Sequence, residues 1–259
     1  MIGYFLTDQA LTLYLLFNSA YMYRITFFLW VALVPIFHAK AQSADKIINN
    51  YIKFIGGEKA WTKLKTLTTS GEYDYGGISF PFKTYAVSPN RYKFIVESDG
   101  KYYAQGFDGT KGWKIDAFKN ETAPTMLNGP EATAMANESN VELMDFVLRS
   151  KLSGVTMTYA GMDSVRSHFC HQIELKQNGT TETLFFDTGT HELVMKKTVS
   201  KNSELNKAPM NIYYSDYRDI GGVKIPFKTV CESAEQVILI ITIDKAMPDV
   251  PIEEKEFQP

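Results

Sequence analysis

The chain has 259 residues, of which 45% are hydrophobic and 22% are charged, so its composition is that of a globular protein rather than a disordered one. The formal net charge is -2, and no run of lysine or arginine is longer than a dipeptide such as Lys196-Lys197. Because binding to a phosphate backbone needs a basic surface, we expect no nucleic-acid partner.

The first 41 residues are typical of an N-terminal extension followed by a cleavable secretory signal. Arg24 precedes an apolar run over 25–37, and Ala39-Lys40-Ala41 places small residues at the two positions that a signal peptidase reads. The run is shorter than the roughly 20 apolar residues of a transmembrane helix, although an uncleaved anchor is the alternative. We expect cleavage after Ala41 and a natural start at Met22, since residues 1–21 do not fit a signal peptide.

The expected mature protein, residues 42–259, begins with Gln42 and therefore has no cysteine at the cleavage site to carry a lipid. Removal of residues 1–41 takes away Arg24, Lys40 and Asp8, which leaves 25 basic and 28 acidic residues and a net charge of -3. The sequence thus predicts a soluble, mildly acidic, exported protein.

The mature chain is predicted to begin with a helix over 43–64, with Ser43 as its N-cap. Apolar residues recur on one face of this segment, at Ile47, Ile48, Tyr51, Ile52 and Ile55. Gly56-Gly57 interrupts the helix, and a short second turn over 58–64 follows.

From Leu67 onward the pattern changes to an alternation of apolar and polar residues, which indicates an antiparallel meander. The segment 91–98 shows the alternation best, with Tyr92, Phe94 and Val96 on one side. Eleven or twelve strands are expected, separated by tight turns at Gly76-Gly77, Asp99-Gly100, Asp108-Gly109, Asn178-Gly179, Thr188-Gly189 and Gly221-Gly222. The last strand, 236–244, is apolar on both faces, so we expect a central strand that is covered on both sides.

One insert, at about residues 117–152, interrupts the meander. It contains Pro124 and two helical patterns, over 131–136 and 141–150, and five of the ten methionines of the chain fall between positions 126 and 162. No linker separates the strands before the insert from those after it. We therefore expect a single domain over 42–259, with the insert forming a helical lid on the sheet.

Residues with catalytic or metal-binding chemistry are sparse. His168, Cys170 and His171 lie at nearby positions of one predicted strand without a fourth ligand, so we predict no metal site. The sequence has neither a G-x-S-x-G elbow nor a phosphate-binding loop, and we predict no catalytic residue, no cofactor and no enzymatic activity. Cys170 and Cys231 are free to pair in an oxidising compartment, but their predicted strand faces differ, so the disulfide is left open.

Aromatic residues are abundant, with 15 Tyr, 17 Phe and 3 Trp, and many alternate along the predicted strands. They would fill the core of a β-sandwich, or they would line a hydrophobic cavity inside a curved sheet, because a single sheet of this width must curl or split. For the second case the candidate ligand-binding residues are Phe80, Phe82, Tyr92, Phe94, Trp113, Met126, Met135, Met144 and Phe185.

Several motifs appear in one order along residues 43–259. They are the segments 55–61 (IGGEKAW), Gly76-Gly77 with Pro81-Phe82, 88–92 (SPNRY), 107–113 (FDGTKGW), Phe186-Asp187, and 215–218 (SDYR) before Gly221-Gly222. In this order they resemble the outer-membrane lipoprotein-sorting-protein-like, or LolA-like, group of periplasmic carriers. The resemblance implies a mainly β fold: a single strongly curved antiparallel sheet forming an unclosed half-barrel around a hydrophobic cavity, with an N-terminal helix and a helical lid.

The function implied by the resemblance is non-catalytic binding of lipid or of lipoprotein acyl chains. The expected partners are lipid or acylated protein cargo and membrane-anchored donor or acceptor proteins, with the carrier itself a monomer. An alternative is an envelope interaction or structural module without lipid cargo, which would use an exposed strand edge near Pro81 or Pro226.

Overall fold

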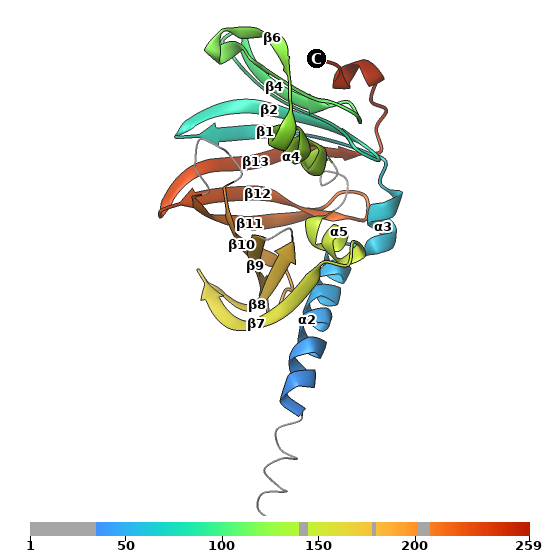
Figure 1. Cartoon of the computed structure of the whole chain (residues 1–259), viewed down its shortest axis with the longest axis vertical. Coiled ribbons are helices and arrows are strands. Elements are labelled where there is room, and N and C mark those ends of the chain that lie inside the picture. The colour runs from blue at the N-terminus through green and yellow to red at the C-terminus, as the bar shows by residue number, and fades with distance from the viewer. Residues whose placement is uncertain (1–34, 140–144, 178–179, 201–207) are drawn as a thin grey trace, which may run out of the picture. The chain divides into compact units, whose positions relative to one another are not determined.

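The computed structural model describes residues 35–139, 145–177, 180–200 and 208–259 (Figure 1). The chain divides into two compact units, residues 1–43 and 44–259. Of the first unit, only the stretch 35–43 is described, as the beginning of helix α2 (Pro35–Phe54). The apolar run of the predicted signal peptide lies largely outside the described residues, and the predicted cleavage position after Ala41 lies within α2.

The helices of the second unit are short after α2. They are α3 (Glu58–Lys63), α4 (Gly129–Ser139) and α5 (Phe146–Leu152), with 3-10 turns η1 (Ala117–Lys119) and η3 (Glu254–Phe257). The prediction of Ser43 as an N-cap is wrong, because α2 begins at Pro35 and runs through Ser43. No glycine or proline between 36 and 43 interrupts the helix, so Ser43 lies inside it. The predicted break at Gly56-Gly57 is confirmed, with φ of 105° and 83°.

Thirteen strands form one antiparallel sheet in the order β6-β5-β4-β3-β2-β1-β13-β12-β11-β10-β9-β8-β7. The strands are β1 (Thr66–Tyr75), β2 (Ile78–Val87), β3 (Arg91–Ser98), β4 (Lys101–Phe107), β5 (Gly112–Asp116), β6 (Glu121–Met126), β7 (Thr156–Val165), β8 (His168–Gln177), β9 (Thr180–Asp187), β10 (Leu193–Val199), β11 (Pro209–Asp219), β12 (Lys224–Ser233) and β13 (Gln236–Pro248).

Every neighbouring pair in this sheet is consecutive in the sequence, except β1 and β13. The first six strands run outward from β1 to one edge, and the last seven return from the other edge to β13. The insert carries the chain from edge strand β6 to edge strand β7. Because β6 and β7 do not pair with each other, the sheet stays open, which confirms the predicted unclosed antiparallel sheet.

The insert differs from its prediction at its start. Residues 121–126 form strand β6, and they were missed because all six are exposed and show no apolar alternation. This strand raises the number above the expected eleven or twelve. The helices of the insert are α4, longer than the predicted 131–136, and α5, which begins at Phe146 after its N-cap Asp145. Of the predicted helix over 141–150, positions 141–144 lie outside the described residues.

The sequence suggested that Pro81 and Pro226 lie near sheet edges. This is wrong, because β2 and β12 are interior strands. Each proline nevertheless lies just outside one of the two ladders of its strand. The β2–β3 ladder begins at Phe82, and the β12–β13 ladder begins at Lys228. At its position each proline pairs with one neighbouring strand only, so its missing N–H leaves no carbonyl of a second strand without a donor.

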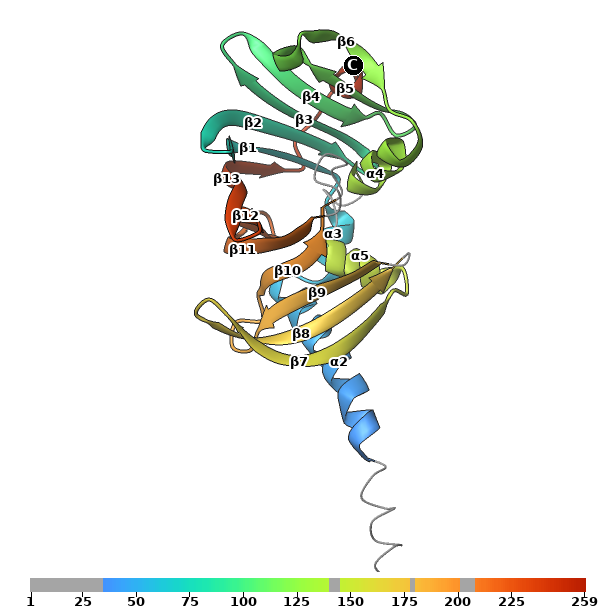
Figure 2. The ribbon, with the colours of Figure 1, turned by 60° about the vertical axis from the view of Figure 1, so that its left-hand side comes forward.

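One face of the sheet carries the helices and the main core (Figure 2). Buried residues of α2, α4 and α5 pack there against strands from both halves, in a cluster that includes Tyr51, Met135, Leu148, Tyr92 and Phe186. We call this the helix-bearing face. Two smaller clusters lie on the other face: Val165, Cys170, Phe185, Val194 and Met195 form one, and Ala104, Trp113 and Ile115 form the other.

The corner between α2 and α3 is tied to the turn between β11 and β12. The carbonyl of Ile55 accepts hydrogen bonds from the Lys224 N–H at 3.0 Å and from Nε1 of Trp61 at 3.0 Å. Gly56 packs so closely that a Cβ there would lie 2.1 Å from the carbonyl oxygen of Gly222. This contact holds the end of α2 against the start of β12, before the β12–β13 ladder begins at Lys228.

We predict that Gly71→Ala destabilises the protein by several kcal/mol. A Cβ at Gly71 would lie 2.0 Å from the carbonyl oxygen of Thr242, at the register shift between Ser70 and Gly71 in the β1–β13 ladder. The measurement is the urea midpoint of unfolding. Gly189→Ala is the control, because its new Cβ would meet nothing closer than 3.5 Å and should change stability by less than about 1 kcal/mol. Equal stabilities of the two variants would contradict the prediction.

Candidate functional site

The helices cover only part of the helix-bearing face. They gather toward the end of the sheet where β1 begins, away from the β1–β2 hairpin (Figures 1 and 2). Along β1 the side chains on this face become progressively more exposed: Leu67 is 3% exposed, Thr69 is 5% exposed and Tyr75 is 53% exposed. Strand β2 shows the same gradient, from Ala86 at 1% to Ile78 at 62%.

The uncovered end of this face is apolar. Strand register places Tyr73 beside Phe80 on β2 and beside Ile241 on β13, and it places Tyr75 beside Ile78 and Leu239. Each of these six side chains is half-buried or exposed. We call the six residues, Tyr73, Tyr75, Ile78, Phe80, Leu239 and Ile241, the open apolar patch.

Strand β13 was expected to be covered on both sides, but the protein covers it only in part, at Ile243 and Ala246 beside the main core. The strand is central in the sheet, but none of its residues from Gln236 to Pro248 is buried. The helices lie toward the other end of the strands, and on the opposite face Ile240 pairs with Val230 and Asp74 without being buried. An apolar strand has therefore been left accessible.

Aromatic rings support the patch from β3 and β4. Phe94 packs against Tyr73 with ring centroids 5.3 Å apart, stacks on Phe82 at 6.1 Å and meets Tyr103 at 6.5 Å. Phe80 contacts Phe118 edge-on at 5.8 Å. Such tilted and edge-on contacts restrain the rings, so this wall of the surface is pre-formed.

The nine candidate ligand-binding residues are divided by the structure. Five lie on the helix-bearing face or in its core: Phe80 and Phe94 are half-buried, whereas Phe82, Tyr92 and Met135 are buried at 4 to 6% exposure. Only Phe80 belongs to the open apolar patch. A ligand-binding role for these five stays a prediction.

The other candidates do not line this surface. Trp113 and Phe185 lie on the opposite face, in its two small clusters, so the expectation that they share one surface with Phe82 and Phe94 is wrong. Met126, in edge strand β6, pairs with Trp113 and is 43% exposed. Met144 lies outside the described residues. Alternation along a strand shows which residues share a face, but it does not show which face bears the helices.

A buried polar contact holds α5 on the sheet. Asp145 is the N-cap of α5: its Oδ1 accepts the N–H groups of Val147 at 3.0 Å and Leu148 at 3.1 Å. Its Oδ2 accepts the hydroxyl of Tyr51 on α2 at 2.6 Å. Burial raises the pKa of Asp145, although these hydrogen bonds oppose the rise. Val147 and Leu148 are fully buried beneath the helix.

Charged side chains lie beside this contact on the same face. The ammonium of Lys196 on β10 is 3.8 Å from the carboxylate of Glu182 on β9 and 4.6 Å from the ring centre of Phe146. Tyr214 on β11 packs at the edge of the core, and burial, followed by Cys231, Glu182 and Asp145, raises its pKa. No sequence motif links these residues, because they come from three different strands.

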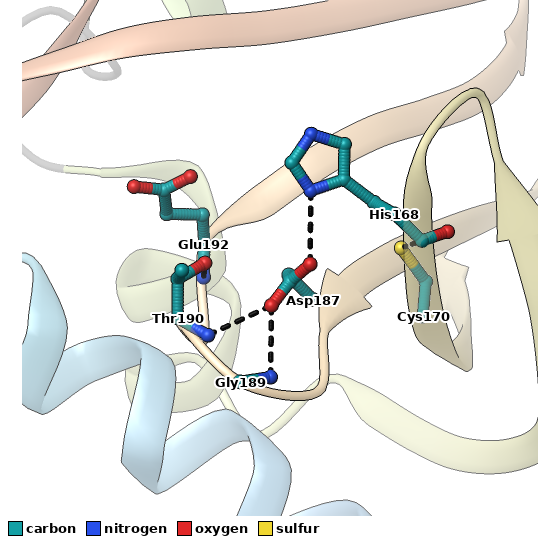
Figure 3. Close-up of polar contacts among 6 residues, drawn as sticks. All are labelled: His168, Cys170, Asp187, Gly189, Thr190 and Glu192. Atoms are coloured by element: carbon teal, nitrogen blue, oxygen red, sulfur yellow. Dashed lines mark hydrogen bonds and ion pairs between the residues drawn. The ribbon is translucent and has the colours of Figure 1, made fainter.

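The three metal-capable residues on β8, His168, Cys170 and His171, do not converge. Figure 3 shows the side chain of His168 beside Asp187. Nδ1 of His168 pairs with Oδ2 of Asp187 at 2.9 Å, while Oδ1 of the same carboxylate accepts the N–H groups of Gly189 and Thr190. Cys170 is buried in the small cluster on the opposite face, and His171 lies on the helix-bearing face beside Tyr159. In the described part of the chain, no three metal-binding side chains gather.

Both cysteines are unpaired and buried. Cys170 lies on the face opposite to the helices, whereas Cys231 is in register with Leu239 of the open apolar patch. Burial raises the pKa of each thiol to about 11. The disulfide that the sequence left open is therefore absent from the folded domain, as the different strand faces had suggested.

Comparison with solved structures finds the same fold in bacterial proteins of low sequence identity. A DUF1329 family protein from Desulfovibrio piger is 12% identical with a TM-score of 0.56, and the match covers 83% of this chain and 97% of that one. A LolA superfamily protein from Nitrosomonas europaea is 11% identical, with a TM-score of 0.52 and coverage of 83% and 97%. A putative outer membrane lipoprotein-sorting protein domain from Vibrio parahaemolyticus is 8% identical, with a TM-score of 0.56 and coverage of 84% and 97%.

No family model and no curated protein matches the sequence. The structural likeness confirms the LolA-like open half-barrel that the motif order had indicated. At these identities the likeness establishes the fold alone. Among the described helices, none has both the length and the apolar content to cross a membrane.

We predict that Asp145→Ala lowers the free energy of unfolding by about 2 kcal/mol, because it removes the N-cap of α5 and the acceptor of the Tyr51 hydroxyl. Asp145→Asn keeps an oxygen at the capping position and should lose less than half as much. Urea unfolding followed by circular dichroism measures both. Similar losses in the two variants would show that the cap does not hold α5.

We also predict that Asp187 stabilises the fold in a pH-dependent way. Partial burial opposes its ionisation, but hydrogen bonds from the Thr190 N–H, His168 and the Gly189 N–H outweigh burial and lower its pKa to about 2. A carboxyl whose pKa is lower in the folded state stabilises that state above its unfolded pKa of about 3.9 and loses this effect as pH falls toward 2. The stability difference between wild type and Asp187→Asn should therefore shrink as pH falls below 4. A constant difference down to pH 2 would contradict the assignment.

Proposed function

We propose that this protein binds the acyl chains of lipids or lipoproteins on the open apolar patch and carries them through the periplasm, without catalysing a reaction. The observation that carries the proposal is the exposure of a pre-formed apolar surface at the uncovered end of the helix-bearing face, with Tyr75 at 53% and Ile78 at 62%. Monomeric soluble proteins rarely leave contiguous apolar surface of this kind exposed without a use for it.

The energetics favour an extended apolar ligand. Each methylene that leaves water contributes about 0.8 kcal/mol, so a chain lying along the row from Phe80 through Tyr73 to Ile241 would gain affinity from every carbon that it buries. The patch spans three strands, about 10 Å at the usual strand spacing. The aromatic support from Phe94 reduces the entropy that would be lost on binding.

The helices of the insert would act as the cover of this site. They lie on the helix-bearing face, where Met135 of α4 and Val147 of α5 pack into the core. Displacement of α5, which is seven residues long, would extend the open apolar patch toward Phe186 and Leu193. In this proposal the insert is the helical lid that the sequence predicted, and it covers the same acyl chains.

Export is part of the proposal. It rests on the signal-like run over 25–37 and the small residues at Ala39 and Ala41, and on the fold shared with a protein described as a putative outer membrane lipoprotein-sorting protein domain. Membrane-anchored donors and acceptors of the cargo would be its protein partners.

A second candidate function is protein interaction through the edge of the sheet at β7. This strand pairs only with β8 and contains no proline, lysine or arginine between Thr156 and Val165, whereas edge strand β6 contains Pro124. Edges without such residues can accept a further strand. This module would need no lipid cargo, which separates it from the carrier.

The test is native mass spectrometry of the full chain, expressed in a Gram-negative host and recovered from the periplasm without detergent, with lipid extraction of the same sample. A discrete added mass that extracts as phospholipid or acylated peptide is expected, together with an N-terminus at residue 42. A bare protein mass that stays bare after incubation with lipid would remove the carrier function and favour the module at β7.

We predict that Ile241→Glu reduces the lipid recovered with the protein at least tenfold. A carboxylate in the middle of the patch must be desolvated by a bound acyl chain, which costs more than the 1.4 kcal/mol that corresponds to a factor of ten. Ile240→Glu is the matched control, because its side chain lies on the opposite face of the same strand and is similarly half-buried. Equal lipid recovery with the two variants would contradict binding at this patch.

A further inference from the structure

We infer that the acyl-binding surface ends in a polar site made by Tyr214, Lys196 and Glu182, which receives an uncharged carbonyl group of the ligand and discriminates against a free carboxylate. The inference rests on the proposed function, since it concerns the polar group of the same amphipathic ligand. It assigns the ligand class as acyl esters or acyl amides rather than fatty acid anions.

Strand register connects the polar site to the open apolar patch. On the helix-bearing face, Ile241 is beside Thr229 of β12, and Thr229 is beside Tyr214 of β11. The next row runs from Leu239 through Cys231 and Ile212 to Lys196. Tyr214 is three strands from Tyr73, roughly 14 Å at the usual strand spacing. A single chain lying across the strands would thus reach from the patch to the polar site.

The protein uses only part of the hydrogen-bonding capacity of Lys196 and Glu182. Lys196 and Glu182 have side chains that are 16% and 17% exposed, and their charged atoms are 3.8 Å apart, which is longer than a hydrogen bond. Glu182 also accepts the Thr198 hydroxyl at 2.8 Å. The ammonium faces the ring of Phe146 at 4.6 Å and retains donor capacity for another group.

Tyr214 supplies a second donor. The structure gives its hydroxyl no hydrogen-bond partner within the described residues, although the side chain packs against the core. Burial and the neighbouring acidic groups Cys231, Glu182 and Asp145 raise its pKa, so the hydroxyl stays protonated at neutral pH. A protonated phenol donates to a carbonyl oxygen.

The balance of charge decides which polar group fits. One ammonium, that of Lys196, lies near two acidic side chains, Glu182 and Asp145. A ligand carboxylate would bring a third acidic group into a partly buried site, and neighbouring like charges disfavour ionisation. A neutral carbonyl oxygen accepts from Tyr214 and Lys196 without that repulsion, so esters and amides are favoured.

The test compares a 1-monoacylglycerol, an N-acyl dipeptide amide and the free fatty acid of the same chain length, each displacing a fluorescent apolar probe from the full-length protein at a pH where the acid is ionised. We expect the ester or the amide to bind at least tenfold more tightly than the acid. A stronger ester points to a lipid as the source of the carbonyl, and a stronger amide points to an acylated protein; either result supports the site.

Variants locate the effect. Tyr214→Phe should weaken the ester and amide about tenfold and leave the apolar probe unchanged, whereas Tyr213→Phe, on the opposite face, should change neither. Glu182→Gln should raise the affinity for the fatty acid about tenfold by removing one negative charge, a gain that misfolding cannot imitate.

If the probe binds but these variants leave the ratio of ester affinity to acid affinity unchanged, the polar site is overturned and the carrier function stands. If no ligand and no probe binds to the wild type, the proposed function itself is wrong.

Discussion

The pairing of β1 with β13 is the interaction on which the rest of the structure depends. It is the one contact between neighbouring strands that are distant in the sequence, and nine residues of β1 take part in it. Without it the chain would be two meanders, of six and seven strands, each with an additional open edge. The ladder also contains the register shift at Gly71, where a side chain would collide with the backbone of Thr242. The β1–β13 pairing thus depends on a residue without a Cβ.

The same joint creates the candidate binding surface. It places Tyr73 and Tyr75 of β1 beside Ile241 and Leu239 of β13. The insert between β6 and β7 crosses the helix-bearing face, where α2 also packs, and these helices lie toward one end of the strands. A sheet of thirteen strands has more apolar face than the described helices cover. The covered part is the core, and the uncovered part is the open apolar patch.

Polar groups on this face are concentrated where α5 meets the sheet. Asp145 and Tyr51 satisfy each other, as buried polar groups must. Lys196, Glu182 and Tyr214 are less completely paired, and partly satisfied polar groups in a low-dielectric setting carry a free-energy cost that a ligand can relieve. An apolar surface bordered by such groups is suited to an amphipathic ligand, whose two ends have different requirements.

By itself, the sequence determined the class of fold, because alternating residues and glycine turns are local signals. The antiparallel meander, the break at Gly56-Gly57 and the helical insert were all predicted from them, and the order of motifs indicated the open half-barrel. Local signals could not reveal β6, whose six residues are all exposed, or the start of α2 ahead of Ser43. The tertiary structure decided which face bears the helices, and so moved Trp113 and Phe185 away from the candidate surface. The tertiary structure also brought Asp145, Lys196, Glu182 and Tyr214 together, from the start of α5 and from three strands. The sequence could not show this, because register shifts such as the one between Leu193 and Met195 change which residues of a strand share a face.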